Sequence, residues 1–112
     1  MKNIVVFGAS GDTGRYFIEY FLENYNGNEY QVIATGTRET DCFDSLGVPY
    51  YQVDITNKSD FDKLPSDVYA VLDLAGLMPA RMKGYDPYKY IDVNIIGNLN
   101  ILEYCRKSGA DR

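Results

Sequence analysis

The sequence of 112 residues has no histidine and no tryptophan, and its only cysteines are Cys42 and Cys105. The two cysteines are far apart and lack the spacing of metal ligands, so we interpret them as reduced thiols and expect neither zinc binding nor thiol catalysis. No apolar run approaches the roughly 18 residues of a membrane span, and the first one, Ile4 to Phe7, is too short for a signal peptide. We therefore expect a cytoplasmic protein with no membrane partner.

Positive charge is also scarce. Eleven Lys and Arg face sixteen Asp and Glu, which gives a net charge of -5, and the sequence has no basic run. Nucleic acids attract proteins through clustered Lys and Arg, so we expect no nucleic-acid partner. A chain of this length forms one domain at most.

What the sequence does contain is an alternation of short apolar runs and amphipathic stretches. The run at residues 3–8 is continuously apolar at its centre, as in a strand buried on both faces of a parallel sheet. Further strands are expected at residues 30–35, 48–53 and 68–75, and helices at residues 14–25, 41–46, 59–64 and 87–108. Strands that alternate with crossover helices predict an α/β fold with a doubly wound parallel sheet in the order 3-2-1-4.

The last expected helix runs from about Pro87 to Ser108 and is followed by Gly109, a common stop residue. It carries one apolar stripe made of Ile91, Ile95, Leu99 and Leu102.

The fourth expected strand has two unusual properties. Val71, Leu72 and Leu74 are expected to be buried, so that Asp73 between them would be a buried carboxylate for which the sequence offers no partner. A fold of this type would continue with a fifth strand, so we expect the fourth strand to present an exposed apolar edge.

Three glycines follow the first strand, in the segment Gly8-Ala9-Ser10-Gly11-Asp12-Thr13-Gly14. Glycine lets the backbone turn tightly and approach a ligand with no Cβ in the way, and a helix N-terminus presents free N–H groups. Between a buried strand and an amphipathic helix, this segment predicts a site for the linking phosphates of a dinucleotide. The residues expected to hold them are Gly8, Ser10, Gly11, Asp12, Thr13 and Gly14. A turn that only packs the helix is the alternative.

Four motifs cover nearly the whole chain: Gly8-x-x-Gly11-x-x-Gly14, Val53-Asp54-Ile55-Thr56, Leu74-Ala75-Gly76, and Val93-Asn94-x-x-Gly97-x-x-Asn100-x-Leu102-Glu103. In this order they resemble the extended short-chain dehydrogenases/reductases of the NAD(P)-dependent epimerase/dehydratase family. The last motif is similar to the helix-four pattern of sugar-nucleotide epimerases and dehydratases. The resemblance implies that residues 1–112 are the N-terminal portion of an NAD(P)-binding domain, a truncated Rossmann-like fold.

The resemblance also implies roles for residues that follow the strands. Asp54 would accept a hydrogen bond from the adenine amino group, and the Ile55 amide would complete the contact. Ala75, Gly76 and Leu77 would let the backbone approach the ribose and diphosphate, and Asn94 would shape the active-site backbone and its water. The alternatives are a turn or capping aspartate for Asp54, a plain turn after strand four and an exposed polar residue for Asn94.

The choice of cofactor depends on the end of the second strand. NAD-specific folds usually place an acidic residue there, whereas arginine accommodates the 2'-phosphate of NADP. This sequence has Thr37 and Arg38 and no acid at the strand end, which favours NADP slightly over NAD, although the epimerases of the family mostly use NAD. The alternative is a solvated arginine neutralised by Glu39.

In the family, a Tyr-x-x-x-Lys pair after strand five performs catalysis. The only such string, Tyr85 to Lys89, precedes the last helix, so we expect no catalytic residue here, the true pair beyond Arg112, and a small-molecule substrate bound only by the full-length protein. The function implied is an NAD(P)-dependent sugar-nucleotide epimerase/dehydratase-type oxidoreductase. The alternative is a non-catalytic NAD(P)-sensing module. A homodimer through the last helix or the sheet edge is also expected.

Overall fold

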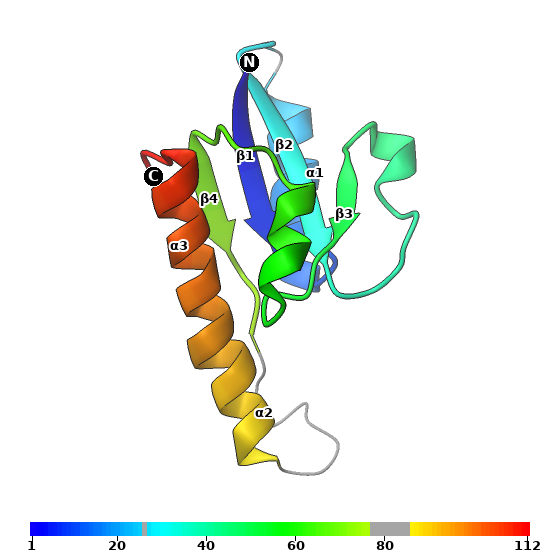
Figure 1. Ribbon diagram of the computed structural model, residues 1–112. Helices are drawn as coiled ribbons and strands as arrows, with labels where there is room; N and C mark the ends of the chain where they lie inside the picture. Colours follow the sequence, from blue (N-terminus) through cyan, green and yellow to red (C-terminus); the bar gives the residue numbers. More distant parts are fainter. Residues whose placement is uncertain (26, 77–85) are drawn as a thin grey trace.

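The computed structural model describes residues 1–25, 27–76 and 86–112, so the predicted site residue Leu77 and Tyr85 lie outside the described residues. Four parallel strands form one sheet in the order β3-β2-β1-β4, which confirms the predicted topology (Figure 1). The strands are β1 (Lys2–Phe7), β2 (Tyr30–Gly36), β3 (Tyr50–Gln52) and β4 (Ala70–Asp73).

β1 lies at the centre of the sheet because it is paired along both edges. Val5 is in register with Ile33 of β2 on one side and with Val71 of β4 on the other. Val5, Val6 and Phe7 are completely buried, as expected for a strand whose two faces are both covered. This accounts for the continuous apolar run in the sequence.

Helical segments cover both faces of the sheet (Figure 1). They are α1 (Asp12–Asn24), the 3-10 turns η1 (Asp44–Leu46) and η2 (Lys58–Lys63), α2 (Pro87–Ile91), the π-helical segment η4 (Asp92–Gly97) and α3 (Asn98–Ser108). On one face, Ile18 of α1 and Phe43 pack on Val6. On the other, Phe7 contacts Phe61 of η2 and Tyr104 of α3, with ring centroids 5.7 and 6.1 Å apart.

The predicted orientation of the last helix is corrected by the structure. Ile91, Ile95, Leu99 and Leu102, the predicted stripe, are between 48% and 64% exposed. The residues that face the sheet are instead Val93, Gly97, Asn100, Ile101, Tyr104 and Ser108. The sheet-facing side was missed because three of its members are glycine, asparagine and serine, which hydrophobicity alone does not select.

Several predicted elements are shorter than expected. The helix at residues 41–46 is only the turn η1, β3 spans three residues, and the long helix is interrupted by the π-helical η4. β4 ends at Asp73, and Leu74 is 37% exposed. Hydrogen bonding to β1 ends at Leu74, whose amide donates to Phe7 O at 2.9 Å, so the predicted continuation of this strand to Ala75 is wrong.

The edge of β4 is partly covered in this structure, which corrects the expectation of a fully exposed edge. The Asp111 amide donates to Tyr69 O at 2.8 Å, and the Val71 amide donates to Arg112 O at 3.0 Å. These bonds protect the first half of β4 from pairing with another strand.

Within the three described ranges, no helix is both long and apolar enough to cross a membrane. The same part of the chain holds no cluster of three or more His, Cys, Asp or Glu side chains that could bind a metal ion.

Candidate functional site

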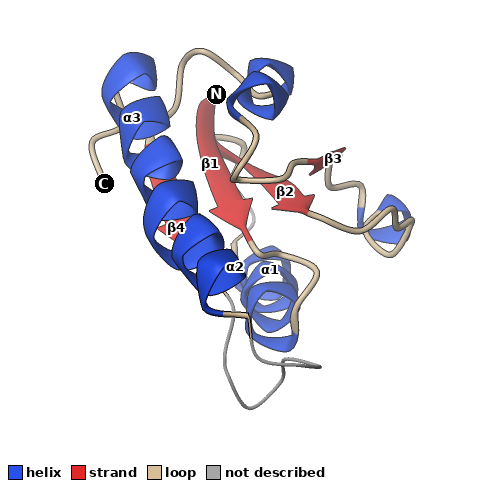
Figure 2. Cartoon of the chain, turned by 60° about the horizontal axis from the view of Figure 1, so that its bottom comes forward, coloured by secondary structure: helices blue, strands red, loops and turns tan. Residues whose placement is uncertain are grey.

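A cavity of about 1090 Å³ opens where the strands end at their carboxyl side, the edge turned forward in Figure 2. In open α/β sheets, ligands bind at this edge, and the volume is at the upper end of the usual range for ligand pockets. The lining includes every predicted site residue in the described ranges except Arg38 and Asn94, namely Gly8, Ser10, Gly11, Asp12, Thr13, Gly14, Thr37, Asp54, Ile55, Ala75 and Gly76.

Gly8 follows β1 and has a backbone conformation that other residues rarely adopt. Its φ is +77°, and a Cβ at this position would lie 2.7 Å from the carbonyl carbon of Leu74 and 2.8 Å from the Ala75 nitrogen. The chain therefore needs glycine here for its conformation and for the close approach of the segment after β4.

Gly14 and Gly11 have different constraints. A Cβ on Gly14 would lie 2.6 Å from Gly8 O and 2.7 Å from Ala9 Cα, so Gly14 allows α1 to start close to the loop. Gly11 has an ordinary φ of -78°, and a Cβ there would meet only Gly8 O, at 3.5 Å. Its lack of a side chain is not needed for the fold, which is consistent with space kept open for a ligand.

The start of α1 is open toward this cavity. Gly11 is the N-cap residue and provides no side-chain hydrogen bond to the first turn. Backbone N–H groups at an uncapped helix start, together with the helix dipole, favour an anion. A carboxylate, that of Asp12, also lies in this first turn.

Asp54 follows β3 and shapes the loop that closes one side of the cavity. Its Oδ1 accepts hydrogen bonds from the Thr56 amide at 3.0 Å and from Thr56 Oγ1 at 2.7 Å. The turn role that the sequence left as an alternative is therefore present. Its Oδ2 forms no hydrogen bond within the described ranges, and the contact with adenine stays a prediction.

Ile55 is fixed from the opposite side by α3. The Asn100 side chain is 7% exposed, and its Nδ2 donates to Ile55 O at 2.8 Å. Gly97 packs on the Ile55 side chain, since a Cβ on Gly97 would lie 2.6 Å from Ile55 Cδ1. Asn100 is part of the helix motif in the sequence, but no role was predicted for it.

The residues after β2 form hydrogen bonds with the glycine-rich loop on one side and with β3 on the other. Arg38 Nη2 donates to Ser10 O at 2.8 Å, across the glycine-rich loop. Tyr50 Oη donates to Arg38 O at 2.5 Å, and Gln52 Nε2 donates to Thr37 O at 2.9 Å. Burial raises the pKa of the Tyr50 phenol, an effect opposed by the Ser10 hydroxyl and by the charge of Arg38.

The segment after β4 forms the remaining wall. Asp73 Oδ1 accepts a hydrogen bond from the Ala75 amide at 3.1 Å, which is the partner that the sequence did not supply. The expectation that Asp73 is buried is wrong, because the residue is exposed at the end of β4. Partial desolvation still raises the pKa of its carboxyl, and the hydrogen bond from the Ala75 amide opposes this. Asn94 lies behind this wall, because a Cβ on Gly76 would be 3.1 Å from its Oδ1.

Three lining residues in and after α2 were not predicted: Lys89, Asp92 and Val93. One indication of them was present in the sequence: Val93 belongs to the helix motif, next to Asn94, which was predicted as a site residue. Lys89 belongs to the Tyr-x-x-x-Lys string that is not expected to be catalytic. It lies in α2, which Asp86 caps by accepting hydrogen bonds from the Tyr88 and Lys89 amides.

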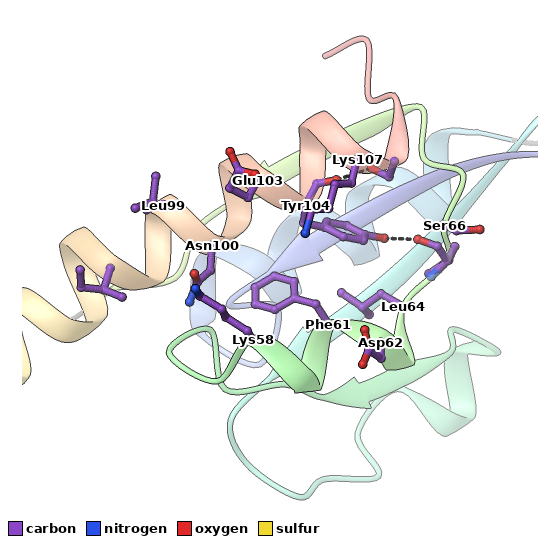
Figure 3. A pocket seen from close by; sticks show the side chains of 13 residues that line it. Lys58, Phe61, Asp62, Leu64, Ser66, Leu99, Asn100, Glu103, Tyr104 and Lys107 are labelled. Atoms are coloured by element: carbon purple, nitrogen blue, oxygen red, sulfur yellow. Dashed lines mark hydrogen bonds between the residues drawn. The ribbon is translucent and has the colours of Figure 1, made fainter.

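A second cavity, of about 700 Å³, lies on the opposite side of η2, between η2 and α3. Figure 3 shows Phe61 of η2 and Tyr104 of α3 projecting into the same space, with Leu99, Glu103 and Lys107 along α3. The Tyr104 hydroxyl donates a hydrogen bond to Pro65 O. The lining of this second cavity contains no glycine and does not include the start of α1, so we place the candidate site at the larger cavity.

The geometry of the larger cavity fits a dinucleotide. The glycine loop and the uncapped start of α1 line it together, and a Cβ on Gly11 would meet only Gly8 O, at 3.5 Å, so this part of the loop is open. Residues after β2 and β3 extend the cavity to one side, and the segment after β4 extends it to the other.

Comparison with known proteins agrees with this geometry. Residues 4–112 match the sequence pattern described as the NAD dependent epimerase/dehydratase family. A UDP-N-acetylglucosamine 4,6-dehydratase (inverting) from Campylobacter jejuni is 25% identical over 99% of this chain and 34% of its own length. A UDP-glucuronate 4-epimerase from Thermodesulfobacterium geofontis is 32% identical over 100% of this chain and 38% of its own length. The chain thus spans about a third of the length of these curated relatives.

Solved structures show the same fold. L-threonine dehydrogenase from Clostridium difficile superposes with a TM-score of 0.78 at 25% identity, covering 98% of this chain and 34% of that one. A UDP-glucose 4-epimerase from Thermus thermophilus in complex with NAD gives a TM-score of 0.72 at 26% identity, covering 96% of this chain and 34% of that one.

Proposed function

The chain belongs to the NAD dependent epimerase/dehydratase family, and on this premise we propose that it binds an NAD(P) dinucleotide in the cavity at the carboxyl ends of its strands. The observation that supports this most strongly is the loop after β1. Gly8 and Gly14 are required by the fold, whereas Gly11 is left open beside the uncapped start of α1. A loop that served packing alone would not need glycine at position 11.

We assign the diphosphate to the backbone N–H groups of the loop, contributed by Gly8, Ser10, Gly11, Asp12, Thr13 and Gly14. Thr37 and Arg38 would contact the adenosine ribose, and Asp54 and Ile55 the adenine. Ala75, Gly76 and Leu77 would lie along the other ribose, with Asn94 supporting them. When bound, the nicotinamide would supply a hydride acceptor and donor, while these residues orient it and shield one of its faces.

The activity proposed for the whole protein is that of an oxidoreductase, epimerase or dehydratase acting on a sugar nucleotide or a similar hydroxylated substrate. The dehydratase and epimerase names of the two curated relatives support this class. We further propose that this chain alone does not turn over substrate, because the Tyr-x-x-x-Lys pair of the family would follow residue 112. Substrate conversion by the purified 112-residue chain, with no added protein, would refute this.

The second candidate function is an NAD(P)-sensing module without catalysis. It uses the same cavity and the same binding residues, so binding experiments do not separate it from the enzyme. A longer sequence would separate the two, because the enzyme needs the Tyr-x-x-x-Lys pair and a sensor does not.

For the cofactor, we propose that both dinucleotides bind and that NADP is slightly preferred. No acidic residue ends β2, and the Arg38 guanidinium already lies over the glycine-rich loop. A calorimetric titration with NADP and NAD, repeated on Arg38→Ala, tests this. Loss of NADP affinity with NAD affinity retained supports the proposal, and an equal effect on both contradicts the role of Arg38.

We also propose self-association through the exposed face of the last helix. Ile91, Ile95, Leu99 and Leu102 are each about half exposed or more and recur at helical spacing, and clustered exposed apolar residues usually mark interaction sites. Sedimentation velocity should show a dimer that Leu99→Glu converts to monomer. A wild type that remains monomeric at high concentration would contradict the proposal.

A further inference from the structure

The loop after β2 is held in place by side chains of the edge strand β3, a feature that the cofactor assignment does not use. Tyr50 and Gln52 are two residues apart, so their side chains leave the same face of the strand. Tyr50 Oη donates to Arg38 O at 2.5 Å, and Gln52 Nε2 donates to Thr37 O at 2.9 Å. Two consecutive carbonyl groups of the loop are thereby fixed by one strand.

The position of Tyr50 is itself well determined. Its ring stacks on the completely buried Phe43, with centroids 5.7 Å apart and an angle of 16° between the planes. Gly36, the last residue of β2, leaves the space in which the Tyr50 hydroxyl and Ser10 Oγ meet, since a Cβ on Gly36 would lie 2.7 Å from each. The Tyr50 hydroxyl therefore reaches the loop from a rigid base.

Holding the carbonyl of Arg38 also sets the direction of its side chain. The guanidinium crosses the glycine-rich loop, and among the described residues it gives one hydrogen bond, from Nη2 to Ser10 O at 2.8 Å. Guanidinium has five N–H donors, so most of them remain for a ligand. A planar, permanently charged fork beside the ribose end of the cavity suits a phosphate group.

On this geometry, and resting on the proposed dinucleotide function, we propose that Tyr50 and Gln52 are positioning residues that set the preference for a 2'-phosphate. They act through the Thr37–Arg38 backbone and do not touch the cofactor. Without them the loop would sample several conformations, and Arg38 would lose part of its pre-organisation for the phosphate. The rest of the dinucleotide is held by other residues, so its binding would be little affected.

The test compares Tyr50→Phe, which removes only the hydroxyl, with Tyr51→Phe as the matched control on the opposite face of β3. Dissociation constants are measured by calorimetry for NADP, NAD, 2',5'-ADP and 5'-AMP. For Tyr50→Phe we expect NADP and 2',5'-ADP to bind about three- to ten-fold more weakly, the usual effect of one lost hydrogen bond. NAD and 5'-AMP should change less than about two-fold, and Tyr51→Phe should change nothing. Gln52→Met, which removes the second donor, should act in the same direction as Tyr50→Phe.

A double-mutant cycle shows whether Tyr50 acts through Arg38. In the Arg38→Ala background, Tyr50→Phe should have no further effect on NADP affinity. Three outcomes would overturn the inference: an unchanged ratio of NADP to NAD affinity, an equal loss of both, or an effect that persists without Arg38. If the wild type binds neither dinucleotide, the proposed function itself fails. If it binds both and the 2'-phosphate adds nothing, only the positioning role fails.

Discussion

The glycines after β1 differ in what each one does for the protein. Gly8 has a positive φ, and backbone atoms fill the space around its Cα, whereas Gly11 meets neither condition. The pattern in the sequence treats the three glycines as equivalent, and only the structure separates those needed for folding from the one available to a ligand.

Alanine substitutions should therefore give opposite results at Gly8 and Gly11. Gly8→Ala should lower the free energy of unfolding by about 2 to 4 kcal/mol, because it adds a close backbone contact to a strained φ. Gly11→Ala should unfold at nearly the wild-type temperature and lose about ten-fold or more in dinucleotide affinity. Thermal unfolding and calorimetry measure the two effects. Gly47→Ala is the control, since Gly47 has a φ of +69° and a Cβ added there would meet no other part of the chain within 4 Å. A Gly11→Ala protein that binds normally would argue against the phosphate role.

Asp12 places a carboxylate in the first turn of α1, beside the expected diphosphate. Removing its charge in Asp12→Asn should strengthen dinucleotide binding by about two- to five-fold, because a like charge is lost. The same change should lower stability by about 0.3 to 1 kcal/mol, since an acidic residue favours the helix N-terminus. Raising the salt concentration should reduce the gain in affinity. Unchanged affinity at low salt would place the phosphates elsewhere.

Asp73 should make stability depend on pH. Partial desolvation raises the pKa of its carboxyl in the folded state above the ordinary value of 3.8, so the folded protein holds this proton more tightly than the unfolded chain. The ionised form therefore costs stability once the pH exceeds the raised pKa, and this cost is absent below 3.8.

Asp73→Asn keeps an oxygen that can accept from the Ala75 amide and removes the charge. Near neutral pH it should be more stable than the wild type, by less than about 1 kcal/mol because the side chain is partly exposed. Urea unfolding at several pH values should show this difference disappearing in acid. An equal difference at acid and neutral pH would rule out ionisation as its cause.

At the scale of elements, the last helix has two faces with different functions. Adjacent residues of α3 show the contrast, since Ile101 is 2% exposed and Leu102 is 64% exposed. The face toward the sheet uses Gly97 and Asn100 to approach the loop at Ile55 closely, so this helix contacts the part of the cavity wall that follows β3.

Alanine substitutions at Ile101 and Leu102 should distinguish the buried face of the helix from its exposed face. Ile101→Ala should cost about 2 to 5 kcal/mol of stability, whereas Leu102→Ala should change it by less than about 0.5 kcal/mol. Denaturant unfolding at low protein concentration is the measurement, so that any association does not contribute. A larger loss for Leu102→Ala than for Ile101→Ala would mean that the helix is oriented as its apolar stripe alone predicts.

The sequence predicted elements that depend on local pattern and missed those that depend on tertiary contact. The apolar run of β1 and the glycine loop determine the sheet and the place of the cavity. The orientation of α3 could not be predicted, because its buried face is selected by close approach and by the bond from Asn100 to Ile55. The roles of Tyr50 and Gln52 were missed for the same reason, since both reach a loop from a different strand.

At the scale of the whole molecule, two cavities in the described part of the chain are large enough to consider for the dinucleotide, and the proposed function requires the larger one. The larger one lies at the carboxyl ends of the strands and contains the glycine loop. The smaller one lies between η2 and α3 (Figure 3). The two share no lining residue, so binding at one is distinguishable from binding at the other.

A titration of the isotopically labelled protein with NADP and NAD, followed through its amide NMR signals, tests the central claim most directly. We predict saturable shifts at Gly8 to Gly14, Thr37, Ile55 and Gly76, with little change at Phe61 and Lys107. Shifts concentrated around Phe61 and Lys107, or a glycine loop that does not respond to either dinucleotide, would contradict the account.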